Sequence, residues 1–252
     1  SNFLRNKISD QLANLGLVEV LSNSLSTRNY ISELNFNNYN DPEHVTILNP
    51  LSADTEVMRQ SLIFNLLEII HYNERNGESN VKIFEFGKVY KNVNNSYKEE
   101  ENLVIGLFGS QNEEHWFNGS PEVSFFQLKG IVLSIIEALG LESLCQTSSL
   151  QNNLYSDGIS YIIKDSKIAE IGWPSSELSN YVGLKTSVFI ATIFWEKLIE
   201  FTQLNKIAFK PLIKHPKVYR DLSLLIDNSI TFKAIKDVAY KADISILKKV
   251  HL

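Results

Sequence analysis

The chain has 252 residues, a hydrophobic fraction of 44%, a net charge of −5 and a single cysteine, Cys145. This composition is that of a globular protein with a core, and one cysteine excludes an internal disulfide and a cysteine-based metal cluster. No apolar run approaches the roughly 18 residues of a membrane span, and the N-terminus lacks the basic-then-apolar pattern of a signal peptide. We therefore predict a cytoplasmic protein without a membrane segment.

Charge divides the chain into two parts. Residues 205–252 contain ten Lys or Arg and four Asp, a net charge of +6, whereas residues 1–204 carry −11. A basic segment of this kind is either a solvated, lysine-rich surface or a binding surface for a polyanion. The charge pattern alone leaves both interpretations open.

The first third of the chain predicts two helices and short strands. Apolar residues recur at helical spacing in residues 3–15, and strands are predicted at 17–25 and 44–48. The helix at 61–77 is the most apolar, because only Asn65 and Glu68 are polar within its central stretch LIFNLLEII. A helix that is apolar nearly all round must be covered on more than one side.

The middle of the chain predicts an antiparallel sheet with helices on it. Strands 81–91 and 102–109 suit an antiparallel pair joined by a polar connection, and a helix follows at 123–139. Residues 160–173 predict two short strands about a Lys-Asp-Ser turn, and residues 187–201 begin as a strand and end as a helix. The predicted fold class is α+β, an antiparallel sheet flanked by helices.

The basic segment predicts a second, smaller unit. After a proline-containing connector we expect a strand at 218–226, a helix capped by Ser229 or Thr231, and a last strand near Leu247. This order corresponds to about half of a ferredoxin-like unit. We predict two domains, residues 1–204 and residues 205–252.

Catalytic and metal-binding signatures are absent from the sequence. The five histidines are scattered, and neither a nucleophile elbow nor a phosphate-binding glycine loop occurs. Acidic pairs lie in polar loops, where a solvated carboxylate is favoured over a general acid. We predict no catalytic residue and no metal ligand.

Three segments, in order along the chain, carry a family resemblance. They are LNPLSADTEVMRQSL (48–62) with IFEFGKVY (83–90), FFQLKGIVLSIIEALG (125–140) and HPKVYRDLSLLID (215–227). Together they resemble the beta subunit of bacterial phenylalanine–tRNA ligase, the last segment being similar to the start of its anticodon-binding domain. Residues 155–158 and 172–177 depart from the family pattern, which puts a role for those positions in doubt.

The resemblance implies part of a longer subunit. Residues 1–204 would be a class II synthetase-like module, and residues 205–252 the truncated first half, a partial βαβ, of a ferredoxin-fold anticodon-binding domain. The implied partners are the catalytic alpha subunit, in an alpha2-beta2 heterotetramer, and phenylalanine tRNA. ATP and Mg²⁺ would serve the holoenzyme, and this part of it would bind no cofactor.

The same resemblance implies that the class II module is catalytically inactive. Adenylate formation places negative charge on phosphate oxygens, which positioned arginines and magnesium must offset. Class II synthetases supply one arginine from a strand as Arg-x-Glu, but here Ile83 precedes Phe84 and Glu85. The segment VFIATIFWEKLI also lacks the glycine and arginine of the closing helix. We predict a fold that has kept its surfaces and lost this chemistry.

Two sets of binding residues follow as predictions. The candidates for the alpha-subunit interface are Leu4, Ile8, Leu62, Leu66 and Ile70, with an internal core as the competing interpretation. The candidates for RNA contact are Lys214, Lys217 and Arg220. Arg220 has an alternative role as a structural partner of a nearby aspartate. If strand 218–226 forms, its bare edges predict either poor order or pairing with a second copy.

Other functions remain as alternatives. The first is a free-standing regulatory protein that binds a small molecule on a synthetase-like fold, and the second is a plain RNA-binding module, which the acidic residues 1–204 disfavour. A hydrolase is disfavoured most, because the sequence offers no nucleophile and base.

Overall fold

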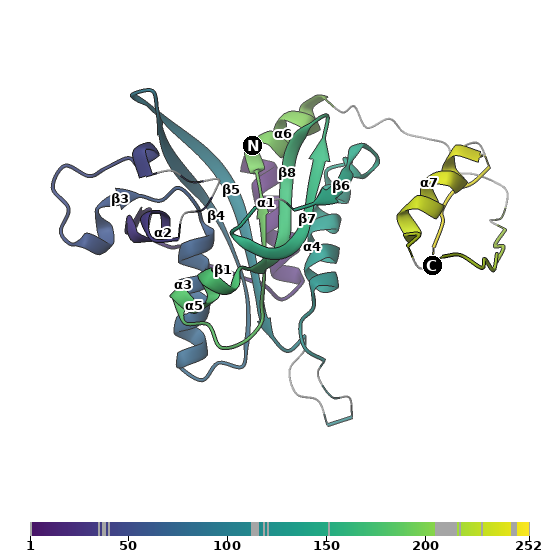
Figure 1. Ribbon diagram of the computed structural model, residues 1–252, viewed down its shortest axis with the longest axis horizontal. Coiled ribbons are helices and arrows are strands. Elements are labelled where there is room, and N and C mark those ends of the chain that lie inside the picture. The colour runs from purple at the N-terminus through teal and green to yellow at the C-terminus, as the bar shows by residue number, and fades with distance from the viewer. Residues whose placement is uncertain are drawn as a thin grey trace. The chain divides into compact units, whose positions relative to one another are not determined.

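The structure is a computed structural model that describes residues 2–34, 36, 39, 41–111, 116–117, 119, 121–150, 152–204, 216, 218–227, 229–242 and 246–251. The chain divides into two compact units, residues 1–207 and residues 208–252. The first unit contains a sheet with helices on both of its faces (Figure 1). Within the described residues no helix is long and apolar enough to cross a membrane.

The helices of the first unit are α1 (Asn2–Asn14), α2 (Asn29–Ser32), α3 (Ile63–Arg75), α4 (Phe125–Ala138), α5 (Ser176–Val182) and α6 (Trp195–Leu204), with 3₁₀ turns at Asp41–Glu43, Ala53–Thr55 and Glu142–Leu144. The strands are β1 (Val18–Glu19), β2 (Leu25–Ser26), β3 (Val57–Met58), β4 (Asn80–Val93), β5 (Ser96–Gly109), β6 (Gln146–Ser149), β7 (Tyr155–Ile163), β8 (Ser166–Pro174) and β9 (Val188–Ile193). The predicted α+β class is confirmed.

Seven strands form one sheet in the order β1-β4-β5-β9-β8-β7-β6. All neighbours are antiparallel except β1, which runs parallel to β4 through the pairs Val18–Ile83 and Glu19–Phe84. The predicted strand at 17–25 is therefore wrong in extent: only its ends form strands, β1 in this sheet and β2 in a separate pair with β3. The predicted strand at 44–48 is reduced to one bridge, from Thr46 to Val57.

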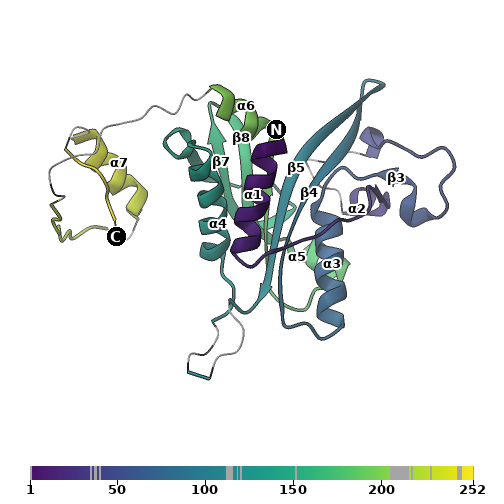
Figure 2. The same ribbon diagram turned by 180° about the vertical axis from the view of Figure 1, so that it is seen from behind.

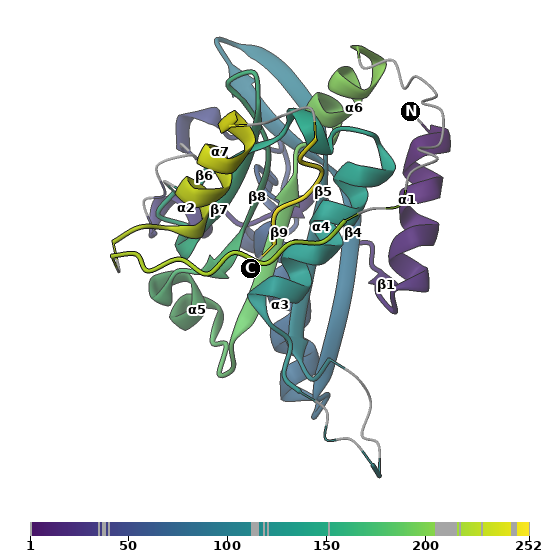
Figure 3. The same cartoon turned by 90° about the vertical axis from the view of Figure 1, so that its right-hand side faces the viewer.

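Each face of the sheet buries its own apolar core, because strand side chains alternate between the faces. One core packs α1, α4 and α6 on side chains such as Phe84, Phe86, Ile105 and Ile171. The other packs α3 and α5 on side chains such as Ile83, Val104, Phe108 and Ile190. Figure 2 shows α1 beside α4, and Figure 3 gives a side view of the same elements.

Local sequence signals explain several element ends. Ser124 caps α4, with its Oγ accepting a hydrogen bond from the amide of Gln127 at 3.3 Å. Asn94 and Asn95 both have positive φ, 52° and 61°, and close the long β4–β5 hairpin. Residues 92–101, the polar stretch expected to connect two shorter strands, are therefore mostly strand. The two-residue turn at Asn94 and Asn95 keeps β4 and β5 paired on both sides of it.

The second unit contains α7 (Phe232–Ala242). Thr231 caps it, with its Oγ1 accepting from the amide of Ala234 at 3.3 Å, as one of the two predicted caps. The predicted strands are wrong: residues 218–227 and 247–250 form no strand. A strand needs a neighbour for its amides and carbonyls, and within the described residues no ladder reaches either segment.

Candidate functional site

A buried ion pair lies on the sheet face that α3 covers. Arg59, directly after β3, places Nη1 2.9 Å from Oε1 of Glu85 in the middle of β4. Their side chains are 3% and 0% exposed. A buried charge needs a partner of opposite sign and further hydrogen bonds, so this pair must be satisfied by the chain around it.

Neighbouring groups supply those bonds. Arg59 Nε donates to the carbonyl of Lys88 at 2.9 Å, and Nη1 donates to Ser22 Oγ at 2.7 Å and to the carbonyl of Asn23 at 3.3 Å. Glu85 accepts from the hydroxyl of Ser22 at 2.6 Å and from its amide at 3.3 Å. The pair thus joins the segment after β1, the residue after β3 and the strand β4.

Gly87 makes room for the guanidinium. A β-carbon at that position would lie 2.4 Å from Arg59 Nη2 and 2.8 Å from Leu62 Cδ2. The arginine therefore lies directly on the backbone of β4, in the space that a larger residue would fill. We call Arg59, Glu85, Ser22 and Gly87 the buried clamp.

A second polar group occupies the same face farther along the sheet. Glu170 on β8 accepts from Lys167 Nζ at 2.5 Å and from Asn152 Nδ2 at 3.4 Å. Burial, and then the charge of Glu170, raises the pKa of Tyr155 well above its usual range, and burial raises that of Tyr39 to about 12. Both phenols are therefore neutral near pH 7.

The arrangement holds the charges of Arg59 and Glu85 in place within the chain. Nucleotide activation needs cations directed at phosphate oxygens. Arg59 and Lys167, two cations of this face, bond to carboxylates of the chain. Within the described residues no group of His, Cys, Asp or Glu could hold a metal ion.

The sequence reasoning missed this clamp. The Arg-x-Glu pattern places an arginine two positions before Glu85 in the same strand, whereas the arginine that pairs with Glu85 is Arg59, directly after β3. The residues of the clamp lie in two of the segments that carry the family resemblance. Arg59 belongs to MRQSL (58–62), and Glu85 and Gly87 belong to IFEFGKVY (83–90). Nothing in the spacing of 26 residues showed that the two segments meet.

The predicted interface side chains lie mostly inside the chain. Leu62, Leu66 and Ile70 pack in the core under α3, and Ile8 packs in the core under α1. Leu4 is half-buried at the edge of the second of these cores. The four buried residues therefore hold this chain's own helices against its sheet and do not lie on a free surface. This is the burial that an amphipathic helix requires. An interface on these helices must use their exposed positions.

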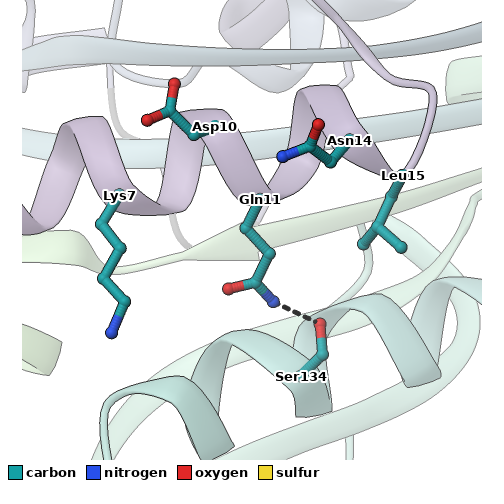
Figure 4. Close-up of a pocket in the computed structure, with 6 residues that line it drawn as sticks. All are labelled: Lys7, Asp10, Gln11, Asn14, Leu15 and Ser134. Carbon is teal, nitrogen blue, oxygen red and sulfur yellow. Dashed lines mark hydrogen bonds between the residues drawn. The ribbon is translucent and has the colours of Figure 1, made fainter.

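A groove runs between α1 and α4, with a volume of about 460 Å³. Figure 4 shows the side chains that line it: Lys7, Asp10, Gln11, Asn14, Leu15 and Ser134. Gln11 Nε2 donates to Ser134 Oγ at 2.9 Å across it. Immediately after α1, the edge segment (residues 18–22) exposes Val18 at 63% and Leu21 at 89%.

The predicted RNA-contact residues lie in the second unit. Lys214 and Lys217 lie outside the described residues. Arg220 is exposed, and among the described residues no ion pair joins it to Asp221 or Asp227. Asp227 instead accepts from the amide and the hydroxyl of Ser229, at 2.9 and 2.7 Å. The role of these three residues in RNA contact therefore stays a prediction.

The fold of the first unit is that of a class II aminoacyl-tRNA synthetase. Pyrrolysyl-tRNA synthetase from Desulfitobacterium hafniense superposes with a TM-score of 0.61 at 17% sequence identity, covering 79% of this chain and 68% of that one. Identity at this level shows the fold and no more.

The family follows from the sequence comparisons. Residues 1–195 match the family described as "Phenylalanyl tRNA synthetase beta chain CLM domain", and the chain belongs to it. The chain is 32% identical over 263 residues to the phenylalanine–tRNA ligase beta subunit of Bacteroides thetaiotaomicron, covering 100% of this chain and 32% of that protein. It is 28% identical over 256 residues to that of Porphyromonas gingivalis, covering 97% and 31%. The chain spans about a third of the length of these relatives.

Proposed function

We propose that this chain is a non-catalytic part of the beta subunit of phenylalanine–tRNA ligase. It supports the ATP-dependent attachment of phenylalanine to its tRNA in the cytoplasm by docking the catalytic alpha subunit, in an alpha2-beta2 assembly. Its second unit contributes to binding the anticodon region. ATP and Mg²⁺ serve the alpha subunit.

The observation that carries this proposal is the buried clamp on a class II fold. The face of the sheet under α3 is filled by Arg59, Glu85 and apolar side chains of α3. The guanidinium donates to a carboxylate, a hydroxyl and two carbonyls of the chain itself. Releasing it toward a phosphate would leave Glu85 buried and unpaired, at a cost of about 3–5 kcal/mol.

The docking surface that we propose is the outer side of α1 with the edge segment. Phe3 is 79% exposed, and Leu15 follows at the end of the same helix. In the described residues β1 pairs on one side only, so its other edge offers unpaired backbone groups. Exposed apolar residues beside an open strand edge are what an obligate subunit interface covers.

One experiment tests the docking part. The full chain is co-expressed with the cognate alpha subunit, and complex formation is measured by their co-purification. Charge substitutions at the proposed surface, Val18→Glu with Leu21→Glu, should abolish co-purification. Phe126→Glu, at a side chain that is 77% exposed on α4, is the matched control and should leave it intact. Equal complex formation by both variants refutes the placement of the interface.

A second experiment tests inactivity and tRNA binding. Phenylalanine-dependent ATP–pyrophosphate exchange should be absent for this chain alone and present when the alpha subunit and the complete beta subunit are supplied. Arg220→Ala should weaken tRNA binding by the assembled enzyme and lower its dependence on salt, since each lost phosphate contact removes about one released counterion. Exchange activity from this chain alone contradicts the proposal.

A further inference from the structure

The edge segment is attached to the sheet by very little backbone pairing. β1 makes two register pairs with β4, and the amide of Val20 then donates to the carbonyl of Phe84 at 2.9 Å. At Ser22 the partner changes from the backbone of β4 to the carboxylate of Glu85, which accepts from the amide at 3.3 Å and from the hydroxyl at 2.6 Å. The carboxylate of Glu85 thus provides the hydrogen-bond acceptor at the point where backbone pairing with β4 ends.

Arg59 holds the same serine from the other side. Its Nη1 donates to Ser22 Oγ at 2.7 Å and to the carbonyl of Asn23 at 3.3 Å, while the guanidinium stays paired with Glu85. The serine hydroxyl therefore accepts from the cation and donates to the anion. Because both ions are buried and fixed by further bonds, they restrict Ser22 to one position.

Leu21 lies between these two attachments and points outward. Its neighbours Val20 and Ser22 are both bonded to β4 or its side chains, yet Leu21 itself is 89% exposed. An exposed apolar side chain on a backbone that is fixed at both adjacent residues is already ordered before a partner arrives. Pre-ordering reduces the entropy cost of association.

We propose that the Arg59–Glu85 pair, acting through Ser22, is a positioning device that presents Leu21 and the edge segment to the alpha subunit. This inference rests on the proposed function and adds to it a use for the buried ion pair on the sheet face under α3. The contacts of the pair are with residues of this chain, among them Ser22. The role of the pair is to set the geometry of a docking edge.

The test uses Ser22 variants in the full chain, because they leave the ion pair itself intact. Ser22→Ala removes the bridging hydroxyl, and Ser22→Thr keeps one. A hydrogen bond to a charged group contributes about 1.5 kcal/mol, so Ser22→Ala should weaken alpha-subunit affinity on the order of tenfold. Ser22→Thr should restore it to near the wild-type value.

Hydrogen exchange of the free chain supplies the second readout. The amides of Val20 and Ser22 should exchange faster in Ser22→Ala, whereas amides in the β4–β5 ladder should keep their protection. A wild-type chain that forms no complex overturns the proposed function and this inference with it. A wild-type complex whose affinity and edge-segment exchange are unchanged by Ser22→Ala overturns this inference alone.

Discussion

Arg59 lies on the backbone of Gly87, so closely that a β-carbon there would be 2.4 Å from Nη2. Gly87→Ala should therefore displace the guanidinium from its partners. Overpacking of a buried site costs about 1–3 kcal/mol, and disturbing the ion pair adds to it. We expect a loss of about 3 kcal/mol in the free energy of unfolding, measured by urea titration.

Gly130 on α4 provides the matched control for this glycine. It is exposed, and an added β-carbon would meet nothing within 4 Å. Alanine favours a helix over glycine by about 0.5–1 kcal/mol, so Gly130→Ala should stabilise slightly. If Gly87→Ala behaved like Gly130→Ala, the close contact between Arg59 and β4 would be disproved.

Removing the negative partner tests the ion pair itself. Glu85→Gln keeps the shape of the side chain and leaves the buried Arg59 charge without a carboxylate. Breaking a buried pair in this way costs about 3–5 kcal/mol. Glu99→Gln is the control: its partner Lys88 lies 2.5 Å away, but both side chains are more than half exposed and screened by solvent, so the free energy of unfolding should stay close to that of the wild-type chain. Similar losses in both variants would argue against a buried, unscreened pair.

The sheet and its covering helices were largely predictable, because they follow from local periodicity. The apolar pattern predicted α3 and α4, and the Lys-Asp-Ser turn predicted the β7–β8 hairpin, in which Lys164 and Asp165 take positive φ values of 47° and 66°. These signals act within a few residues. Tertiary contacts did not need to be known.

The clamp and the edge segment were not predictable, because they depend on pairings between distant parts of the chain. Arg59 meets Glu85 across 26 positions, and Ser22 meets it across 63. Residues 17–25 are predicted as one strand, but only three consecutive residues, 18–20, find backbone partners on β4. Strand propensity indicates that a segment fits a sheet. It does not indicate over how many residues a neighbouring strand is available for pairing.

A substitution at Leu66 distinguishes a core role of this residue from an interface role. It is fully buried, and an added β-carbon on Gly106 of β5 would lie 2.9 Å from its Cδ2. Leu66→Ala should cost about 2–5 kcal/mol in the free chain. Leu51→Ala, at a fully exposed side chain, should change stability by less than about 0.5 kcal/mol. A Leu66→Ala variant that keeps its stability and loses only alpha-subunit binding would show that Leu66 acts in the interface and not in the core.

Cys145 yields a prediction about pH. Burial, and then the charge of Glu142, raises the pKa of its thiol from the usual 9 to about 11. The thiolate is the reactive form, so alkylation by iodoacetamide at pH 8 should be roughly 100-fold slower than in urea. Between pH 9 and about 11 the unfolded chain releases this proton and the folded chain keeps it. The contribution of the thiol to stability is therefore complete below pH 9 and is lost as the pH rises toward 11.

Cys145→Ser provides the control, since its hydroxyl does not titrate in this range. The variant should lose less stability between pH 9 and 11 than the wild-type chain, as measured by urea titration at each pH. The native alkylation rate should rise about tenfold per pH unit up to pH 10, because below the pKa the thiolate fraction is inversely proportional to the proton concentration. A native rate at pH 8 equal to the rate in urea would show that the thiol ionises as it does in water, and that its surroundings at the end of the 3₁₀ turn Glu142–Leu144 do not exclude the charged form.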